Sequence, residues 1–126
     1  MPDFLSLEDV LLLHGNQVDL YGGSHGVRDL NLLESAIAQP QATFGSDLLH
    51  GDLFEMAATY LFHIVKNHPF VDGNKRTGVV AALAFLDLNG VEIDAPKGGI
   101  HDLAMSVATG RAGKTEVAAF FRKHSH

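Results

Sequence analysis

Apolar residues recur at intervals of three and four over most of this chain, a spacing typical of amphipathic helices. The first such segment follows Ser6, which can cap a helix with an acidic first turn, and it ends at Gly22-Gly23. The predicted buried face of this helix comprises Leu7, Val10, Leu11, His14, Val18 and Tyr21.

A second helix is predicted after Asp29 or Asn31, either of which can cap it. It runs through residues 32–37 and must stop near Pro40, because proline disfavours the helical conformation of the residue before it. Asp52 can cap a third helix that continues to about Lys66.

A fourth helix is predicted from Asn74 to the pair Asn89-Gly90, where glycine favours a left-handed C-terminal cap. Two more follow, over residues 100–109 and 114–124, while residues 91–93 alternate like a strand too short to found a sheet. The pattern therefore predicts an all-α fold, a compact bundle of about six helices forming a single domain over residues 1–126.

Composition narrows the function classes. The hydrophobic fraction of 46% supports a real core, and the net charge of −6 argues against direct binding of nucleic acid. The longest apolar run, Val79 to Leu86, is far shorter than the ~18 residues of a membrane span, and the N-terminus does not resemble a signal peptide, so we expect a cytosolic protein. The absence of cysteine excludes disulfides, thiolate zinc sites and cysteine nucleophiles.

The polar stretch from His68 to Thr77, His-Pro-Phe-Val-Asp-Gly-Asn-Lys-Arg-Thr, lies between the third and fourth predicted helices. The backbone N–H groups of Gly73, Asn74 and Lys75 would have no intrahelical acceptor at the start of a helix, and such an end binds phosphate. Lys75 and Arg76 add a point charge and a bidentate fork for phosphate oxygens.

Asp72 would repel an anion unless a cation intervened, so a Mg²⁺ ion bridging this carboxylate to phosphates is the economical explanation. His68 can accept a proton near neutral pH, most simply from a hydroxyl that attacks phosphorus. Taken singly, His68 would be an ordinary loop histidine, and Lys75 and Arg76 a solvated helix start. Their convergence on one predicted helix N-terminus favours a phosphate-handling site.

Two other features have ordinary interpretations. The segment Gly22-Gly23-Ser-His-Gly26 lacks the spacing of a dinucleotide fingerprint and is predicted to be a turn between helices. Arg28 could contact a ligand, and an ion pair with Asp29 or Glu34 is an equal alternative. The eight histidines show no spacing typical of a zinc site.

The stretch from His68 resembles the signature of the Fic/Doc family, His-x-Phe-x-Asp/Glu-Gly-Asn-Gly-Arg-x-x-Arg, at His68, Phe70, Asp72, Gly73, Asn74 and Arg76. Lys75 stands where adenylylating Fic members have glycine, and Val79 where they have a second arginine. Both departures resemble the death-on-curing (Doc) branch. Two further segments also look like that branch, Tyr21-Gly-Gly-x-x-Gly-Val-Arg-Asp29 and Leu32-Leu-Glu-Ser-Ala-Ile37.

The resemblance implies a bacterial toxin of a toxin–antitoxin pair. In the family the motif histidine is the general base, the acidic residue holds Mg²⁺, and the asparagine, arginine and loop amides bind phosphates. Those roles would fall to His68, to Asp72, and to Asn74 with Arg76 and the amide of Gly73. In the Doc branch a reversed ATP would give its γ-phosphoryl group to a hydroxyl of a translation elongation factor, with Lys75 as a phosphate ligand.

Two other functions remain open from the sequence. The same loop could transfer AMP to a protein hydroxyl, or it could survive only as an inactive antitoxin-binding module, although intact His68 and Asp72 argue against the second. Self-inhibited Fic proteins carry Ser/Thr-x-x-x-Glu-Gly/Asn, which is not found in this sequence. The resemblance therefore implies inhibition in trans by a cognate antitoxin, whose disordered tail would fold on binding.

Overall fold

The computed structural model describes residues 2–44, 47–48 and 51–126, and within them the chain forms six α-helices. These are α1 (Leu7–Tyr21), α2 (Leu30–Ala38), α3 (Leu53–Asn67), α4 (Asn74–Leu88), α5 (Gly99–Ala108) and α6 (Lys114–Lys123). A short 3₁₀ helix, η1 (Gln39–Gln41), extends α2 through Pro40. The predicted all-α fold is confirmed, and so are the approximate bounds of its helices.

Local side chains explain where the first three helices begin. Ser6 and Asp9 form a reciprocal capping box, in which each side chain accepts a hydrogen bond from the other residue's backbone N–H. Asp29, rather than Asn31, caps α2 by accepting from the N–H of Leu32 at 3.0 Å. Asp52 caps α3 in the same way. Three of the predicted helix starts thus follow from contacts within four residues.

The sequence did not predict one small piece of β structure. The strands β1 (Thr43–Phe44) and β2 (Asp47–Leu48) pair antiparallel, with Thr43 opposite Leu48 and Phe44 opposite Asp47. Residues 91–93 do not form part of a sheet, as predicted, and Ile93 forms an isolated β-bridge to Ser125. These short pairings leave the all-α class unchanged.

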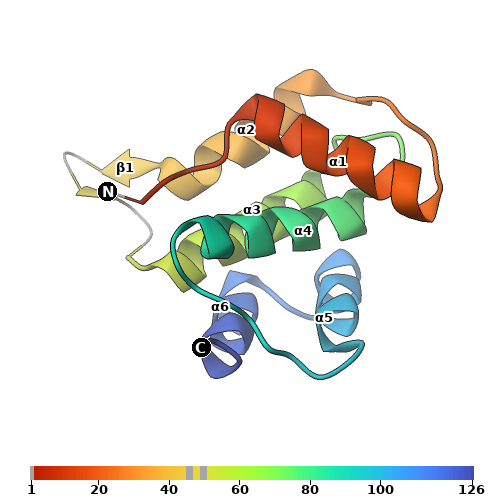
Figure 1. Cartoon of the computed structure of the whole chain (residues 1–126). Coiled ribbons are helices and arrows are strands. Elements are labelled where there is room, and N and C mark those ends of the chain that lie inside the picture. The colour runs from red at the N-terminus through yellow and green to blue at the C-terminus, as the bar shows by residue number, and fades with distance from the viewer. Residues whose placement is uncertain (1, 45–46, 49–50) are drawn as a thin grey trace.

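The helices form three layers, with α1 and α2 above the central pair α3 and α4, and α5 and α6 below it (Figure 1). The shared core between these layers is apolar, and its largest fully buried side chains include Tyr60, Phe70, Phe85 and Phe121. Burial raises the pKa of the Tyr60 phenol to about 12, and its oxygen accepts a hydrogen bond from the N–H of Leu5. One member of the predicted α1 face is wrong, because Tyr21 lies at the helix end with 67% of its surface exposed.

A close approach of α3 and α4 positions the loop between them. A Cβ at Gly78 would lie 3.0 Å from Cγ2 of Val65 and 3.2 Å from the carbonyl oxygen of Leu61, so only glycine fits without a shift. The C-terminus of α3 and the N-terminus of α4 are therefore held side by side, and residues 68–73 connect them. In the described part of the chain, no helix combines the length and apolar character needed to cross a membrane.

Candidate active site

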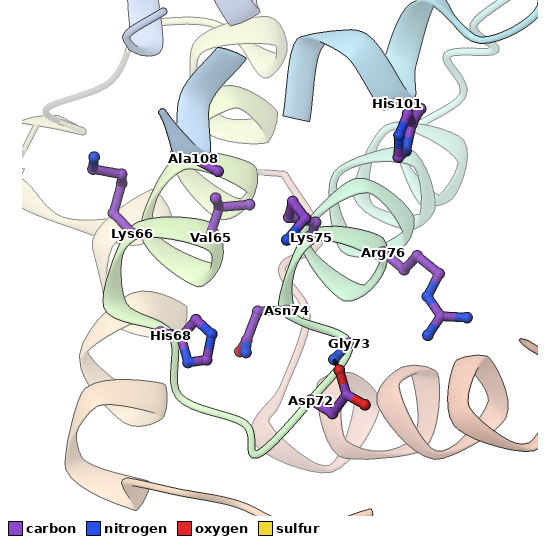
Figure 2. A pocket seen from close by; sticks show the side chains of 10 residues that line it. All are labelled: Val65, Lys66, His68, Asp72, Gly73, Asn74, Lys75, Arg76, His101 and Ala108. Carbon is purple, nitrogen blue, oxygen red and sulfur yellow. Dashed lines mark hydrogen bonds between the residues drawn. The ribbon is translucent and has the colours of Figure 1, made fainter. Parts of the chain in front are cut away.

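A cavity of about 480 Å³ opens at the end of α3 and the start of α4, beneath α5 (Figure 2). It brings together all six residues that the sequence predicted for the site, along with four others that the sequence did not single out. The lining residues are Val65, Lys66, His68, Asp72, Gly73, Asn74, Lys75, Arg76, His101 and Ala108.

His68 is the C-cap of α3 and has a left-handed backbone, with φ 50° and ψ 54°. It is the single non-glycine residue with positive φ in the described ranges. Its N–H still donates to the carbonyl of Ile64, at 3.3 Å, while its side chain is exposed at the cavity. A histidine in this conformation is strained, so surrounding contacts must hold it there.

Arg28 supplies two of those contacts. Its Nε donates to the carbonyl of His68 at 2.7 Å, and one terminal nitrogen donates to the carbonyl of Asn67 at 2.9 Å. Those two carbonyls end α3, where cations and donors are favourable. Arg28 therefore fixes the backbone beneath the candidate base. The ion pair with Asp29 or Glu34, one of the two alternatives from the sequence, does not occur within the described residues, and contact of Arg28 with a ligand stays a prediction.

The loop that carries Arg28 also pairs with the motif backbone. The N–H groups of Arg28 and Asp29 both donate to the carbonyl of Pro69, at 2.7 and 3.0 Å. The N–H of Val71 donates to the carbonyl of Gly26 at 3.0 Å, and Val27 and Phe70 form an antiparallel bridge. The connection between α1 and α2 thus acts as a short strand against residues 69–71. Residues 22–26 connect the two helices, as predicted, but they form an irregular loop and not a regular turn, and this loop helps to build the site.

His14, on the buried face of α1, supports the same loop. Its ring stacks on Phe70, with centroids 3.8 Å apart and planes 5° from parallel. Its Nε2 lies 2.8 Å from the carbonyl oxygen of Asp72, and because a carbonyl only accepts, Nε2 must carry the hydrogen. The sequence placed His14 on the buried face of α1 but gave it no role at the site. A polar residue on an otherwise apolar helix face was the one feature of the sequence that could have pointed to this role.

Asn74 closes the loop through its side chain. Its Oδ1 accepts from the N–H of Phe70 at 2.9 Å, and its Nδ2 donates to the carbonyl of Phe70 at 3.0 Å. The residue is only 5% exposed. In this arrangement the side chain of Asn74 fixes the loop, and its backbone N–H is the group that α4 leaves for an anion.

The start of α4 has the geometry of an anion site. Gly73 precedes the helix with φ 78°, a left-handed conformation that favours glycine, and its carbonyl accepts from the N–H of Thr77. The backbone N–H groups of Asn74, Lys75 and Arg76 consequently have no acceptor within the helix. The N–H of Gly73, which the sequence predicted as a phosphate donor, instead donates to Oδ1 of Asp72 at 2.8 Å.

Asp72 is an exposed carboxylate against the wall of the α1–α2 loop. Its Oδ2 accepts from the N–H of Ser24 at 3.2 Å, and a Cβ at Gly23 would lie 2.8 Å from that oxygen. No cluster of three or more His, Cys, Asp or Glu residues that could hold a metal occurs among the described residues. One exposed carboxylate still fits Mg²⁺, which usually takes one or two protein carboxylates together with waters and substrate phosphates.

The two motif cations point to different sides of α4. Arg76 donates to the carbonyl of Gly22 at 3.0 Å, and its guanidinium carbon lies 5.7 Å from the centroid of the Tyr21 ring. Lys75 is exposed and lies at the centre of the cavity, whereas Arg76 extends away from His68 (Figure 2). Within the described residues neither cation forms an ion pair. Both positive charges therefore remain available to an anion in the cavity.

Comparison with known proteins gives consistent matches. Residues 4–86 match the model of the Fic/DOC family. A protein kinase named doc, from Escherichia phage P1, is 38% identical over 120 residues, which covers 94% of this chain and 93% of the phage protein. Toxin Doc from Mycolicibacterium smegmatis is 40% identical over 122 residues, covering 94% of this chain and 91% of that toxin.

Proposed function

The chain belongs to the Fic/DOC family, and we propose that it is a toxin that transfers the γ-phosphoryl group of ATP to a hydroxyl of a protein. The whole chain, residues 1–126, would act as one domain in this role. The observation that carries the proposal is the convergence on one cavity of a strained histidine, a carboxylate and a cationic helix N-terminus. The names of two relatives, a protein kinase and a toxin, support it.

His68 would serve as the general base. In the proposed reaction the hydroxyl oxygen of the target attacks the γ-phosphorus, and the bond from that phosphorus to the bridging oxygen breaks. The proton of the hydroxyl passes to the imidazole of His68, and ADP leaves. General-base assistance of this kind contributes typically 10²–10⁴-fold to the rate.

The start of α4 would bind the phosphates. The free N–H groups of Asn74, Lys75 and Arg76 and the positive end of the helix dipole favour an anion there. Lys75 and Arg76 add charge from two sides of the helix. Gly73 would contribute by its left-handed turn, and its N–H would reach a phosphate only after leaving Asp72.

Mg²⁺ would be held by Asp72. When bound, this ion neutralises charge on the phosphates and stabilises the charge that develops during transfer. The hydrogen bonds from Gly73 and Ser24 orient the carboxylate, and each carboxylate oxygen keeps a lone pair in addition to the one that accepts its hydrogen bond.

Two partners follow from the proposal. The target would be a protein with an accessible hydroxyl, with a translation elongation factor as the first candidate from the family resemblance. The second partner would be a cognate antitoxin that inhibits in trans, because the sequence contains no Ser/Thr-x-x-x-Glu-Gly/Asn segment and has Val79 where such a segment would find its arginine.

The test uses ATP labelled separately at the γ and α positions, incubated with the purified protein, Mg²⁺ and a bacterial lysate. We expect label on a protein target from γ-labelled ATP alone, and loss of that label in His68→Ala. The exposed His126 lies outside the cavity lining, so His126→Ala is the matched control and should retain transfer.

Other outcomes would replace the proposal. Transfer of the α-label would establish adenylylation instead. Tight nucleotide binding without transfer of either label, together with binding of an antitoxin, would favour an inactive antitoxin-binding module. Full γ transfer by His68→Ala would remove the role of that residue while leaving the kinase activity.

A further inference from the structure

The peptide group between Asp72 and Gly73 has hydrogen-bond partners on two sides of the motif loop. Its carbonyl oxygen accepts from Nε2 of His14 on α1, at 2.8 Å. In the described part of the chain no other donor bonds this carbonyl. Its N–H, which belongs to Gly73, donates to Oδ1 of Asp72, whose side chain lines the active-site cavity. The carbonyl is thus held toward α1 and the N–H toward the cavity.

The orientation of this peptide decides which polar group faces an anion in the cavity. A planar trans peptide points its C=O and its N–H in opposite directions, so fixing one of them fixes the other. In the observed orientation the positive end of the peptide dipole faces the cavity. If the peptide plane turned over, the carbonyl oxygen of Asp72 would face the cavity instead, and its partial negative charge would repel a phosphate.

The backbone at Gly73 does little to prevent such a reorientation. Its φ of 78° and ψ of 19° are close to the values of the third residue in a type II turn. Type I and type II turns differ mainly in the orientation of the peptide between their two central residues. Glycine adopts positive and negative φ about equally readily, so it can accommodate either orientation. The observed orientation therefore depends on contacts with the rest of the protein.

His14 is itself held rigidly enough to provide that contact. Its side chain is only 4% exposed, and the stack on Phe70, with planes 5° from parallel, fixes the plane of its ring. A Cβ at Gly73 would lie 3.7 Å from Nε2, which is ordinary van der Waals contact, so the ring packs directly against this part of the loop. A turned peptide would leave the buried Nε2–H without its acceptor, which is costly.

We propose that His14 is a positioning residue, which keeps the Asp72–Gly73 peptide in the orientation that presents the N–H of Gly73 to an anion. The inference rests on the proposed function for the identity of that anion, a phosphate of ATP. The orientation itself is a property of the protein without nucleotide. This role depends on the hydrogen at Nε2 of His14, and packing of the ring alone would not fulfil it.

Two substitutions separate the hydrogen bond from the ring. His14→Phe keeps an aromatic ring beside Phe70 and removes the donor. His14→Gln removes the ring and keeps an N–H donor the same number of bonds from the backbone. Val18→Ala is the matched control, because Val18 is also 4% exposed on α1 and its Cγ2 would lie 4.0 Å from a Cβ at Gly73, yet its side chain has no donor.

Two measurements are made on each variant after circular dichroism has confirmed that it is folded. The first is the NMR signal of the Gly73 amide in protein without nucleotide, and the second is the affinity for Mg-ATP by calorimetry. His14→Phe should shift the Gly73 signal and weaken ATP binding about 10- to 100-fold, the range of one hydrogen bond to a charged group. His14→Gln should restore the signal and most of the affinity. Val18→Ala should lower the stability of the fold and leave both measurements unchanged.

The opposite pattern would overturn the inference. If His14→Phe kept the Gly73 signal and the ATP affinity, or if His14→Gln failed to restore them, packing of the ring and not its hydrogen bond would hold the loop. Loss of both in Val18→Ala would likewise assign the effect to packing. If the unmodified protein bound no ATP, the proposed function would fail, but the Gly73 signal in the His14 variants would still test the inference. The two failures are therefore distinguishable.

Discussion

Replacing His68 by glycine should leave the protein more stable than replacing it by alanine, the reverse of the usual order in a helix. Both variants lack the imidazole, so their difference reports the backbone alone. His68 has φ 50° and ψ 54° at the C-cap of α3, where the left-handed conformation favours glycine. A contact-based account without backbone strain would predict no such reversal.

The magnitude follows from two opposing effects. The left-handed conformation costs a non-glycine residue roughly 1–2 kcal/mol, and His68→Gly relieves that cost. Glycine in turn loses about 0.5–1 kcal/mol more than alanine through the conformational entropy of the unfolded chain. We therefore expect the free energy of unfolding of His68→Gly to exceed that of His68→Ala by roughly 0.7 kcal/mol.

The assay is equilibrium unfolding in urea, followed by circular dichroism and extrapolated linearly to water. Asn16 provides the control, because it is exposed in the middle of α1 with right-handed helical neighbours. There Asn16→Gly should be less stable than Asn16→Ala by about 1 kcal/mol. If the stability difference between the glycine and alanine variants had the same sign at positions 16 and 68, the strain at His68 would be refuted. Neither variant at position 68 should transfer γ-label, so the two variants should differ in stability but not in activity.

Three further predictions test the contacts that build the site. Arg28→Lys should lower the rate of γ transfer roughly 10- to 100-fold at saturating ATP. An ammonium cannot span the two carbonyls that the guanidinium holds. An unchanged rate would exclude Arg28 as a positioning residue. Asn74→Leu should lower the free energy of unfolding, measured in urea, by roughly 3 kcal/mol, because it leaves the N–H and carbonyl of buried Phe70 unpaired. A loss under about 1 kcal/mol would show that other groups replace the amide. Gly78→Ala should destabilise the fold by about 1–3 kcal/mol by separating α3 from α4. Gly15→Ala, whose added methyl group meets open space in α1, should stabilise it by up to about 1 kcal/mol. If calorimetric melting showed a stability change of the same sign for both variants, the close approach of α3 and α4 would be contradicted.

The helices could be predicted from the sequence because their ends depend on near neighbours. Ser6, Asp29 and Asp52 each bond a backbone N–H three residues ahead, so the information lies within one turn. The six motif residues also reach one cavity as predicted, because all of them lie within residues 68–76, at the junction of two packed helices. Their catalytic and binding roles stay predictions until activity is measured.

What the sequence could not predict depends on contacts across long separations. Arg28 reaches the carbonyl of His68 across 40 residues, and His14 reaches the carbonyl of Asp72 across 58. Neither contact could be predicted from a periodic or local pattern in the sequence. The exposure of Tyr21 was missed for a related reason, since helical spacing assigns a face but cannot show where the neighbouring layer ends.

The loop between α1 and α2 determines how the motif can work, although the motif contains none of its residues. A Cβ at Gly23 would lie 2.8 Å from Oδ2 of Asp72, and the φ of 112° at Gly23 also favours glycine. The same loop accepts Arg76 at the carbonyl of Gly22 and donates to Asp72 from Ser24. The carboxylate and the guanidinium would attract each other directly if the loop did not stand between them. By bonding to both side chains, the backbone of this loop separates the two opposite charges, and no ion pair forms between Asp72 and Arg76 within the described residues.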